Sequence, residues 1–324
     1  MDILVTGSSG YIGSFLISQN KAVPNSVNFI GLDEVPHEGL ARTQYTGSFC
    51  DIKLINRIFN ENPKISHVIH LAALKSAPES AEKLHWYYET NVECTLKFIE
   101  DLSSQRIKKF IFASSAAVYD YSRPPINNLL NENSKLGITS PYGVFKRLIE
   151  AEISRLAVSS PNTQFQSIRI FNPVGLNQHA HWSRRSDLLS KIASCIVENR
   201  ILEIRGNKFD TIDGTAVRDY IPLEDLATGI LEIALSPGKL GLHEIFNLGS
   251  GKETTVLSLV RKVNLLLEAF DRVLRYQISS AIITDSRGYP ADISKVKEFI
   301  GWEPKISLDS ALKPFIESVV KSGQ

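Results

Sequence analysis

The chain has 324 residues, of which 43% are hydrophobic and 22% charged, and its formal net charge is +1. This balance excludes intrinsic disorder, and the dispersed Lys and Arg residues offer no basic surface for nucleic acid. No apolar run approaches the roughly 20 residues of a membrane span, and no basic leader precedes the first strand. The spacing of Cys50, Cys94 and Cys195 fits neither a zinc site nor a disulfide framework. We therefore expect a cytoplasmic protein with reduced thiols and with no nucleic-acid or membrane partner.

Short β-rich runs alternate with longer helical patterns through the first half of the chain. This alternation predicts a Rossmann-type α/β fold, in which a doubly wound parallel sheet is covered by helices on both faces. The expected strands are 3–6, 28–32, 44–49, 67–72, 109–113 and 166–171, and the helices between them begin near 11, 52, 78 and 141. Further on we expect a helix over 186–199, a strand over 201–204, a helix over 223–234, a strand over 243–248, and helices over 255–270 and 309–320.

A glycine-rich turn follows the first strand and opens a helix, with the sequence Gly7-Ser8-Ser9-Gly10-Tyr11-Ile12-Gly13. Three glycines alone are compatible with an ordinary flexible turn. Here, however, the turn lies between a strand and a helix, and Asp33 ends the next strand about 20 residues later, as in dinucleotide-binding folds. The turn therefore predicts a dinucleotide site. The Asp33 carboxylate favours NAD over NADP, because it would accept hydrogen bonds from the ribose and repel a 2′-phosphate.

Two later strand ends add candidate cofactor contacts. Asp51 and Ile52 follow the third strand and would meet the adenine ring, although Asp51 is an equally good helix N-cap. The fourth strand ends in Leu71-Ala72-Ala73, and these mostly small side chains would let a cofactor lie across the carboxyl edge of the sheet. Lys75 would reach the cofactor or the substrate, or else be solvated.

The strongest indication of chemistry comes from Ser115, Tyr142 and Lys146. Tyr142 and Lys146 are four residues apart in a helix whose start is marked by Ser140 and Pro141, so their side chains share a face. To act as a base near neutral pH, a tyrosine needs its pKa lowered by roughly 3 units, which a neighbouring ammonium and a positive nicotinamide ring can supply. Ser115 ends the fifth strand and would bind the substrate oxygen that loses its proton. A lone Tyr-x-x-x-Lys is often an exposed helix pair, but the serine and the glycine turn favour a proton-transfer site.

With these residues the chain resembles the extended short-chain dehydrogenase/reductase family, and within it the UDP-glucose 4-epimerases (UDP-galactose 4-epimerases). The similarity covers nearly the whole chain. It includes Tyr87-Tyr88-Glu89-Thr90-Asn91-Val92, Phe171-Asn172-Pro173-Val174-Gly175, the run from Asp213 to Ile221, Phe246-Asn247-Leu248-Gly249, and Tyr289-Pro290-Ala291-Asp292.

The resemblance implies an NAD-dependent enzyme that inverts C4 of UDP-glucose or UDP-galactose through a transient 4-keto intermediate and keeps NAD tightly bound. Tyr142 would take the proton of the 4-hydroxyl, Lys146 would lower the pKa of Tyr142 and hold the nicotinamide ribose, and Ser115 would orient the 4-oxygen. Asn172 and Arg218 would grip the diphosphate, the alternative for Arg218 being a surface ion pair with Asp219.

The motifs and the resemblance together predict a set of site residues and a division into two domains. The expected cofactor-binding residues are Gly7, Gly10, Tyr11, Ile12, Gly13, Asp33, Asp51, Ile52, Leu71, Ala72, Ala73, Lys75, Asn91, Tyr142, Lys146 and Phe171. The expected substrate-binding residues are Lys75, Ser115, Tyr142, Asn172, Arg218, Asp285, Arg287 and Tyr289. Residues 1–171, with a return segment of about 216–250, would form the NAD-binding domain. Residues 172–215 and 251–324 would form a smaller, mixed α/β domain that binds the nucleotide sugar.

Several departures from the family pattern bear on the reaction and the substrate. Ala116 and Ala117 stand where dehydratases and decarboxylases of this fold carry carboxylates, which favours oxidation and return without elimination. Arg287 either replaces a phosphate-binding arginine or is solvated, and a bulky Tyr289 favours plain hexoses. The alternatives are a 4-epimerase of another UDP-sugar, such as an N-acetylhexosamine or a uronic acid, a related dehydrogenase or dehydratase, and a non-catalytic NAD-binding protein.

Two further expectations concern assembly and metals. The helices near 84–102 and 142–158 carry apolar residues on more than one face, which predicts a homodimer formed through them, with burial under a loop as the alternative. His179 and His181 are the most metal-like pair, but the sequence offers no third ligand, so we expect no metal.

Overall fold

The computed structural model describes residues 1–19, 27–37, 40–103, 105–138, 140–180, 182, 187–281 and 286–323. The chain forms two compact units. The first comprises Met1–Val118, Ser140–Ile170 and Ala227–Phe246, and the second comprises Tyr119–Thr139, Phe171–Leu226 and Asn247–Gln324. Residues 119–139, 171, 216–226 and 247–250 thus belong to the second unit, whereas the sequence-based division places them in the first domain.

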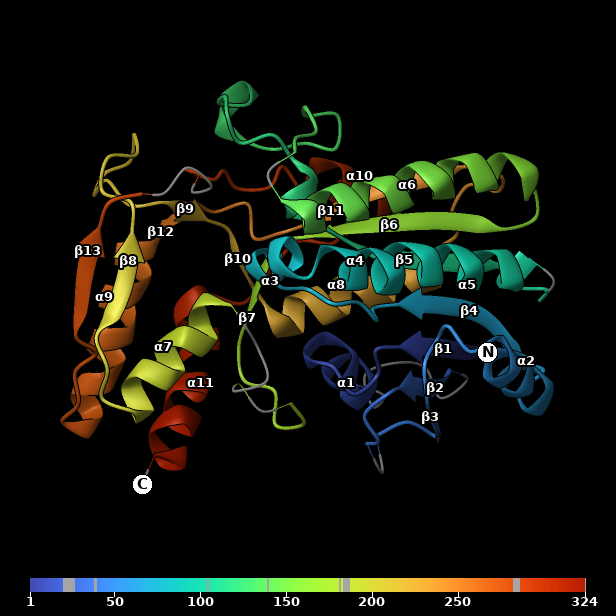
Figure 1. Cartoon of the computed structure of the whole chain (residues 1–324), viewed down its shortest axis with the longest axis horizontal. Coiled ribbons are helices and arrows are strands. Elements are labelled where there is room, and N and C mark those ends of the chain that lie inside the picture. Colours follow the sequence, from blue (N-terminus) through green and yellow to red (C-terminus); the bar gives the residue numbers. More distant parts are fainter. Residues whose placement is uncertain are drawn as a thin grey trace. The chain divides into compact units, whose positions relative to one another are not determined.

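The central sheet has seven strands in the order β11-β6-β5-β4-β1-β2-β3 (Figure 1). All strand pairs from β3 to β6 are parallel. The chain order reverses at β1, as in a Rossmann sheet, so the predicted doubly wound fold is confirmed. The strands are β1 (Asp2–Thr6), β2 (Asn28–Asp33), β3 (Thr43–Thr46), β4 (Ile65–His70), β5 (Lys109–Ser115), β6 (Gln164–Ile170) and β11 (His243–Leu248).

Helices cover both faces of this sheet because its strands are apolar on both sides. On one face Leu4, Val68, Phe110 and Phe112 share a buried cluster with side chains of α2, α5 and α6. Neighbouring strand residues point to the opposite face, where Lys109 reaches the carbonyls of Ile233 and Ser236 at the end of α8. The helices are α1 (Tyr11–Ser18), α2 (Ile52–Glu61), α3 (Ala77–Glu82), α4 (Leu84–Tyr88), α5 (Cys94–Ser103), α6 (Pro141–Ser159) and α8 (Leu223–Leu235).

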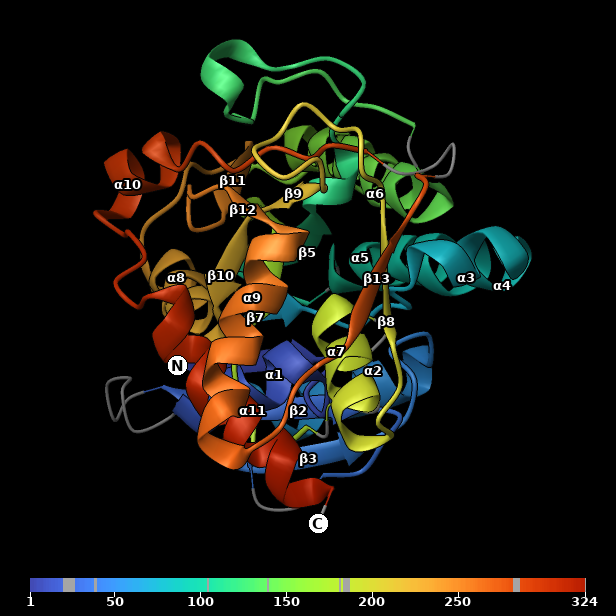
Figure 2. The same cartoon turned by 90° about the vertical axis from the view of Figure 1, so that its left-hand side faces the viewer.

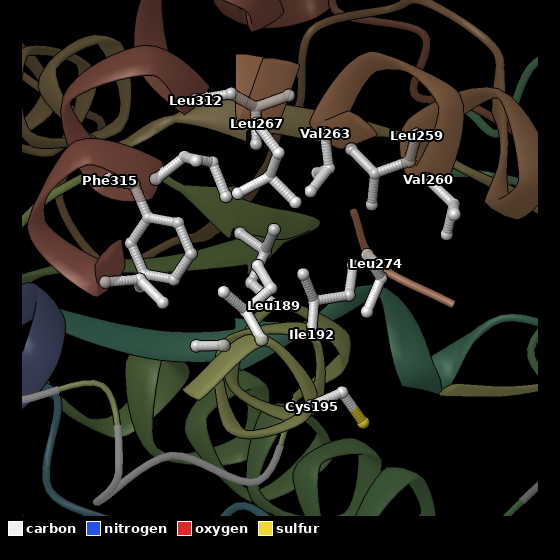
Figure 3. Packing of buried hydrophobic residues seen from close by; sticks show 14 of the residues in the cluster. Leu189, Ile192, Cys195, Leu259, Val260, Val263, Leu267, Leu274, Leu312 and Phe315 are labelled. Atoms are coloured by element: carbon white, nitrogen blue, oxygen red, sulfur yellow. The ribbon is translucent and has the colours of Figure 1, made fainter. Parts of the chain in front are cut away.

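The second unit has its own core, built from α7, α9 and α11 (Figure 2). Figure 3 shows Leu189 and Ile192 of α7 pointing toward Val263 of α9 and Phe315 of α11. The helices are α7 (Leu188–Val197), α9 (Val256–Leu267), α10 (Ser294–Ile300) and α11 (Leu308–Ser322). The strands form three two-stranded sheets: parallel β7 (Asn172–Val174) with β10 (Tyr220–Pro222), antiparallel β9 (Val217–Arg218) with β12 (Thr254–Thr255), and parallel β8 (Leu202–Arg205) with β13 (Tyr276–Ser279). None of the described helices is both long enough and apolar enough to cross a membrane.

The prediction of three reduced thiols was wrong for two of them. Cys50 and Cys94 form a disulfide across a sequence separation of 44 residues, with their Cα atoms 5.0 Å apart, and Cys195 is free and buried. Cys50 precedes α2 and Cys94 begins α5, and both pack against the cluster beneath these helices. The fold brings the two thiols together, and their spacing in the sequence does not predict this pairing.

We expect thiol titration of the unreduced, denatured wild-type protein to detect one free thiol, that of Cys195. The same titration should detect no free thiol in the Cys195→Ser variant. Reduction should lower the free energy of unfolding by about 2–4 kcal/mol, because it frees a long loop in the unfolded chain. Three titratable thiols in freshly purified, unreduced protein would contradict the disulfide.

Candidate active site

The glycine turn is a cradle lined by backbone. Gly7 has φ +73°, and a Cβ atom added there would lie 2.7 Å from the backbone nitrogen of Ala72. A Cβ atom at Gly13 would overlap the carbonyl oxygen of Gly7. Gly10 is the N-cap of α1 and supplies no side-chain hydrogen bond to it. The first N–H groups of α1 are therefore oriented toward the turn, where they suit a pyrophosphate.

Asp33 ties the end of β2 to this turn. Its Oδ2 accepts a hydrogen bond from the Ser9 N–H at 2.9 Å, and its Oδ1 accepts one from the Val35 N–H at 2.9 Å. The carboxylate is half-buried, and each oxygen keeps a lone pair for a further donor. Asp33 therefore stands beside the cradle with a fixed orientation, as an acceptor for ribose hydroxyls would.

Buried polar groups form hydrogen bonds at and beside residues 71–75. The His70 ring bonds to Thr6 Oγ1 at 2.7 Å and to Thr95 Oγ1 at 3.2 Å, and burial lowers its pKa to about 3, so it is neutral. Asn91, in the π-helical turn Glu89–Glu93, accepts from the Leu74 N–H at 2.8 Å and donates to the Leu74 carbonyl at 2.7 Å. The side-chain amide of Asn91, predicted as a cofactor contact, thus binds the backbone of the segment on which the cofactor would lie.

Three other predicted cofactor residues, Asp51, Ile52 and Lys75, lie at exposed positions of the same unit. Asp51 is the N-cap of α2 and accepts from the N–H groups of Lys53 and Leu54, as the alternative interpretation held. Ile52 is 45% exposed, and Lys75 is exposed beyond the end of β4. Phe171 is buried in the second unit, where its N–H donates to the Leu248 carbonyl.

Ser115, Tyr142 and Lys146 meet at the carboxyl end of β5. Ser115 is the last residue of β5, and its hydroxyl bonds to Tyr142. Lys146 Nζ donates to the Ala113 carbonyl at 2.7 Å and lies 5.7 Å from the centre of the Tyr142 ring. The structure therefore brings together the three residues that the sequence singles out for proton transfer.

Several contacts fix the N-terminus of α6 close to Ser115. The Ser140 hydroxyl caps the helix by accepting from the Gly143 N–H, and the Tyr142 N–H donates to Ser80 Oγ at 3.2 Å. A Cβ atom on Gly143 would overlap the carbonyl oxygen of Ala117, so only glycine lets α6 approach this closely. Sequence reasoning missed Ser80 and Gly143. The position of a glycine directly after Tyr142 was a signal for Gly143 in the sequence. The sequence around Ser80 contains no comparable signal.

Burial dominates the charges at this site. It raises the pKa of Tyr142 to about 12, against a lowering by the Ser115 hydrogen bond. It lowers the pKa of Lys146 to about 7, against a raising by Glu150. Burial therefore sets the direction of the Tyr142 shift in the chain alone, and the lowering of the Tyr142 pKa by Lys146 stays a prediction.

The predicted substrate residues of the second unit are bound into its loops. Asn172 donates its side-chain amide to the Asp219 carbonyl at 2.9 Å, and Arg218 Nη1 donates to the Val217 carbonyl at 2.6 Å. Arg287 pairs with Glu253 at 3.3 Å and lies over the buried Tyr289 ring at 4.7 Å, so it is not simply solvated. The buried Asp219 carboxylate accepts from the N–H groups of Ser250, Gly251 and Ala291. Two sequence candidates, Asp285 and His181, lie outside the described residues.

The unusual pKa of Lys146 predicts a pH dependence of stability. Between about pH 7 and pH 10 the unfolded chain binds this proton and the folded chain does not, so the free energy of unfolding rises with pH across that window. We expect this rise to be smaller in Lys146→Met, measured by urea denaturation at several pH values. Lys313→Met, at an exposed lysine of α11, is the matched control. Equal slopes in wild type and Lys146→Met would contradict the assignment.

Comparison with known proteins agrees with this geometry. Residues 3–249 match the model of the NAD dependent epimerase/dehydratase family. The chain is 35% identical to UDP-glucose 4-epimerase of Yersinia pestis, covering 95% of this chain and 94% of the relative. It is 32% identical to the enzyme of that name from Caenorhabditis elegans, with 95% of each covered. Among solved structures, UDP-glucose 4-epimerase from Bifidobacterium longum, in complex with NAD+ and UDP, is 28% identical with a TM-score of 0.84, covering 99% of this chain and 98% of that one. The chain therefore belongs to the NAD-dependent epimerase/dehydratase family.

Proposed function

We propose that this chain is an NAD-dependent 4-epimerase of UDP-sugars and that UDP-glucose and UDP-galactose are its substrates. The observation that carries the proposal is the meeting of Ser115, Tyr142 and Lys146 at the carboxyl end of β5. Relatives named UDP-glucose 4-epimerase that align along nearly the whole chain support it.

The residues around the glycine turn fit NAD. The N-terminus of α1, which has no side-chain cap at Gly10, suits a pyrophosphate, and Asp33 offers a fixed carboxylate, which suits a ribose without a 2′-phosphate. When bound, NAD supplies the group that accepts a hydride from C4 of the sugar and returns it, together with a positive ring near the tyrosine. Because the cofactor ends each cycle unchanged, tight binding carries no penalty for turnover.

The chain's own residues handle the proton. Tyr142 Oη would take it from the sugar 4-hydroxyl, and Ser115 Oγ would hold the same oxygen in place. Lys146 uses one of its three N–H groups on the Ala113 carbonyl, so two remain for the nicotinamide ribose and for stabilising the tyrosinate. Lys146 is buried and Tyr142 is half-buried, so the ammonium charge would act on the phenol with less screening than in water.

The same site argues against elimination. Ala116 and Ala117 follow Ser115 in a short 3₁₀ turn, and Ala116 is buried. No carboxylate therefore stands at these two positions to remove a second proton. In the second unit, Asn172, Arg218 and Arg287 would bind the UDP moiety, and Tyr289 would limit the space for an N-acetyl group.

We expect the purified enzyme to convert UDP-galactose into UDP-glucose without added cofactor, and to release NAD on denaturation. Tyr142→Phe should lower kcat by about 10²–10⁴-fold because it removes the proton acceptor and keeps the ring. The assay is product analysis by chromatography, with Tyr276→Phe, an exposed tyrosine on β13, as the matched control.

Other outcomes separate the alternatives. A lack of turnover of any UDP-hexose would sink the proposal. Turnover of UDP-N-acetylgalactosamine alone, or stoichiometric conversion with accumulation of NADH, would replace it by a different sugar or by a dehydrogenase.

We also propose a homodimer formed through α4 and α6. These helices pack on each other, with the Tyr88 and Phe145 rings 5.7 Å apart, and Phe145, Ile149 and Ile153 are buried within the unit. Trp86 remains 45% exposed on α4, and Leu148 remains 47% exposed on α6. Two large apolar side chains on neighbouring helices suit a self-complementary contact.

We expect sedimentation equilibrium to give twice the chain mass of 36.1 kDa for the wild type and a monomer for Leu148→Glu. Leu265→Glu, which places the same charge at a 65% exposed leucine of α9, should stay dimeric. A monomeric wild type at micromolar concentration would refute the dimer.

The location in the cell stays a prediction. A cytoplasmic enzyme is consistent with the membership of the family and with the absence of a spanning helix among the described residues. The Cys50–Cys94 disulfide is more typical of an oxidising compartment.

A further inference from the structure

A fully buried charge network lies directly behind the proposed catalytic residues. Arg169 of β6 and Glu150 of α6 form an ion pair whose side chains are only 2% and 5% exposed. Arg169 Nε and Nη2 donate to the two Glu150 oxygens at 3.0 Å and 2.7 Å. Ser114 Oγ donates to the same carboxylate at 2.5 Å. Three elements of the first unit thus converge on one carboxylate.

The network connects the parts that must meet for catalysis. Ser114 precedes Ser115 on β5 and lies opposite Arg169 in the β5–β6 register. Glu150 lies one helical turn after Lys146 on α6, the helix that also carries Tyr142. A bidentate Arg–carboxylate pair is directional, whereas the aliphatic contacts of Ile149, Ile153 and Ala157 leave α6 freer to slide or rotate.

Burying an ion pair is a costly way to hold a helix, because hydrophobic side chains of similar volume usually stabilise a core as well or better. The pair is therefore better explained by a contribution to geometry and charge than by stability. The groups near Lys146 are consistent with this. Its other ionisable neighbours are His70, which burial keeps neutral, and Tyr142, which burial keeps protonated, while Glu150 is the neighbour that favours the ammonium.

We propose that Glu150 and Arg169 are positioning residues for the epimerase: they fix α6 on β5, so that Tyr142 and Lys146 meet Ser115. Glu150 also opposes the loss of the Lys146 proton that burial favours. This inference rests on the proposed function for its kinetic consequences. Its structural part, the charge state of Lys146, stands apart from activity. Arg169 pairs with Glu150 in the core, and Glu150 in turn favours the ammonium form of Lys146.

The decisive variant is Glu150→Gln/Arg169→Met, which removes both charges of the buried ion pair together. Its matched control is Glu152→Gln/Arg155→Met, which removes the exposed ion pair of the same helix. With the NAD-loaded enzyme and UDP-galactose, we expect the buried double variant to lose at least about tenfold in kcat, with KM nearly unchanged. The alkaline limb of its pH profile should shift downward by about one pH unit, because Lys146 gives up its proton earlier.

The protonation of Lys146 can also be measured independently of catalysis, by NMR titration of ¹³C-labelled lysine. The Lys146→Met variant assigns the signal. We expect its midpoint to fall in the buried double variant and to stay unchanged in the exposed one. If the wild type converts no UDP-hexose, the proposed function fails, while this titration still tests the network.

Unchanged kcat, pH profile and Lys146 midpoint in a folded buried double variant would overturn the proposal. Should that variant not fold, Arg169→Lys decides the matter, because it keeps the charge and loses the bidentate grip. We expect it to lower kcat and leave the alkaline limb in place. Wild-type kcat in Arg169→Lys would then overturn the positioning role.

Discussion

The docking of α6 on the carboxyl end of β5 is the contact on which the proposed chemistry depends. The helix comes so close that Gly143 has no room for a Cβ atom against the Ala117 carbonyl. Ser140, Ser80 and the Glu150–Arg169 pair hold it there through polar contacts along its first three turns. Tyr142 and Lys146 project from this fixed stretch toward Ser115, which explains why a helix and a strand far apart in the sequence form one site.

Burial at this contact has opposite effects on the two proton carriers. Removal from water stabilises the neutral form of each group, so the phenol keeps its proton and the ammonium holds its proton less tightly. A site meant only for stability would avoid two such groups side by side. A site that moves one proton between a sugar hydroxyl and a tyrosine gains from them, since small changes in local charge then decide where the proton resides.

Long periodic segments were predictable from the sequence, whereas contacts between them were not. The sheet strands, the glycine turn and the Tyr142-Lys146 helix all follow from local patterns, since each has a period or a capping residue that can be read directly. The strands β7, β9, β10 and β12 have two or three residues, too few to show alternation. The Cys50–Cys94 disulfide and the Glu150–Arg169 pair depend on which elements become neighbours. A charged residue inside an apolar strand, such as Arg169, was the signal that could have indicated a buried partner.

Carboxylates whose oxygens are occupied by protein donors recur at the functional loops of both units. Asp33 accepts the Ser9 N–H of the glycine turn and the Val35 N–H after β2, and Glu150 accepts hydrogen bonds from Arg169 and Ser114. In the second unit, the buried Asp219 accepts N–H groups from Ser250, Gly251 and Ala291, which brings two loop segments to one side chain. Burial raises the pKa of Asp219, and these hydrogen bonds oppose that rise. Asp33 and Asp219 therefore orient backbone N–H groups, whereas Glu150 orients the side chains of two neighbouring strands. Because the net charge is only +1, the diphosphates of the proposed ligands would be bound by the N-terminus of α1 and by individual arginines such as Arg218, and not by a general excess of positive charge.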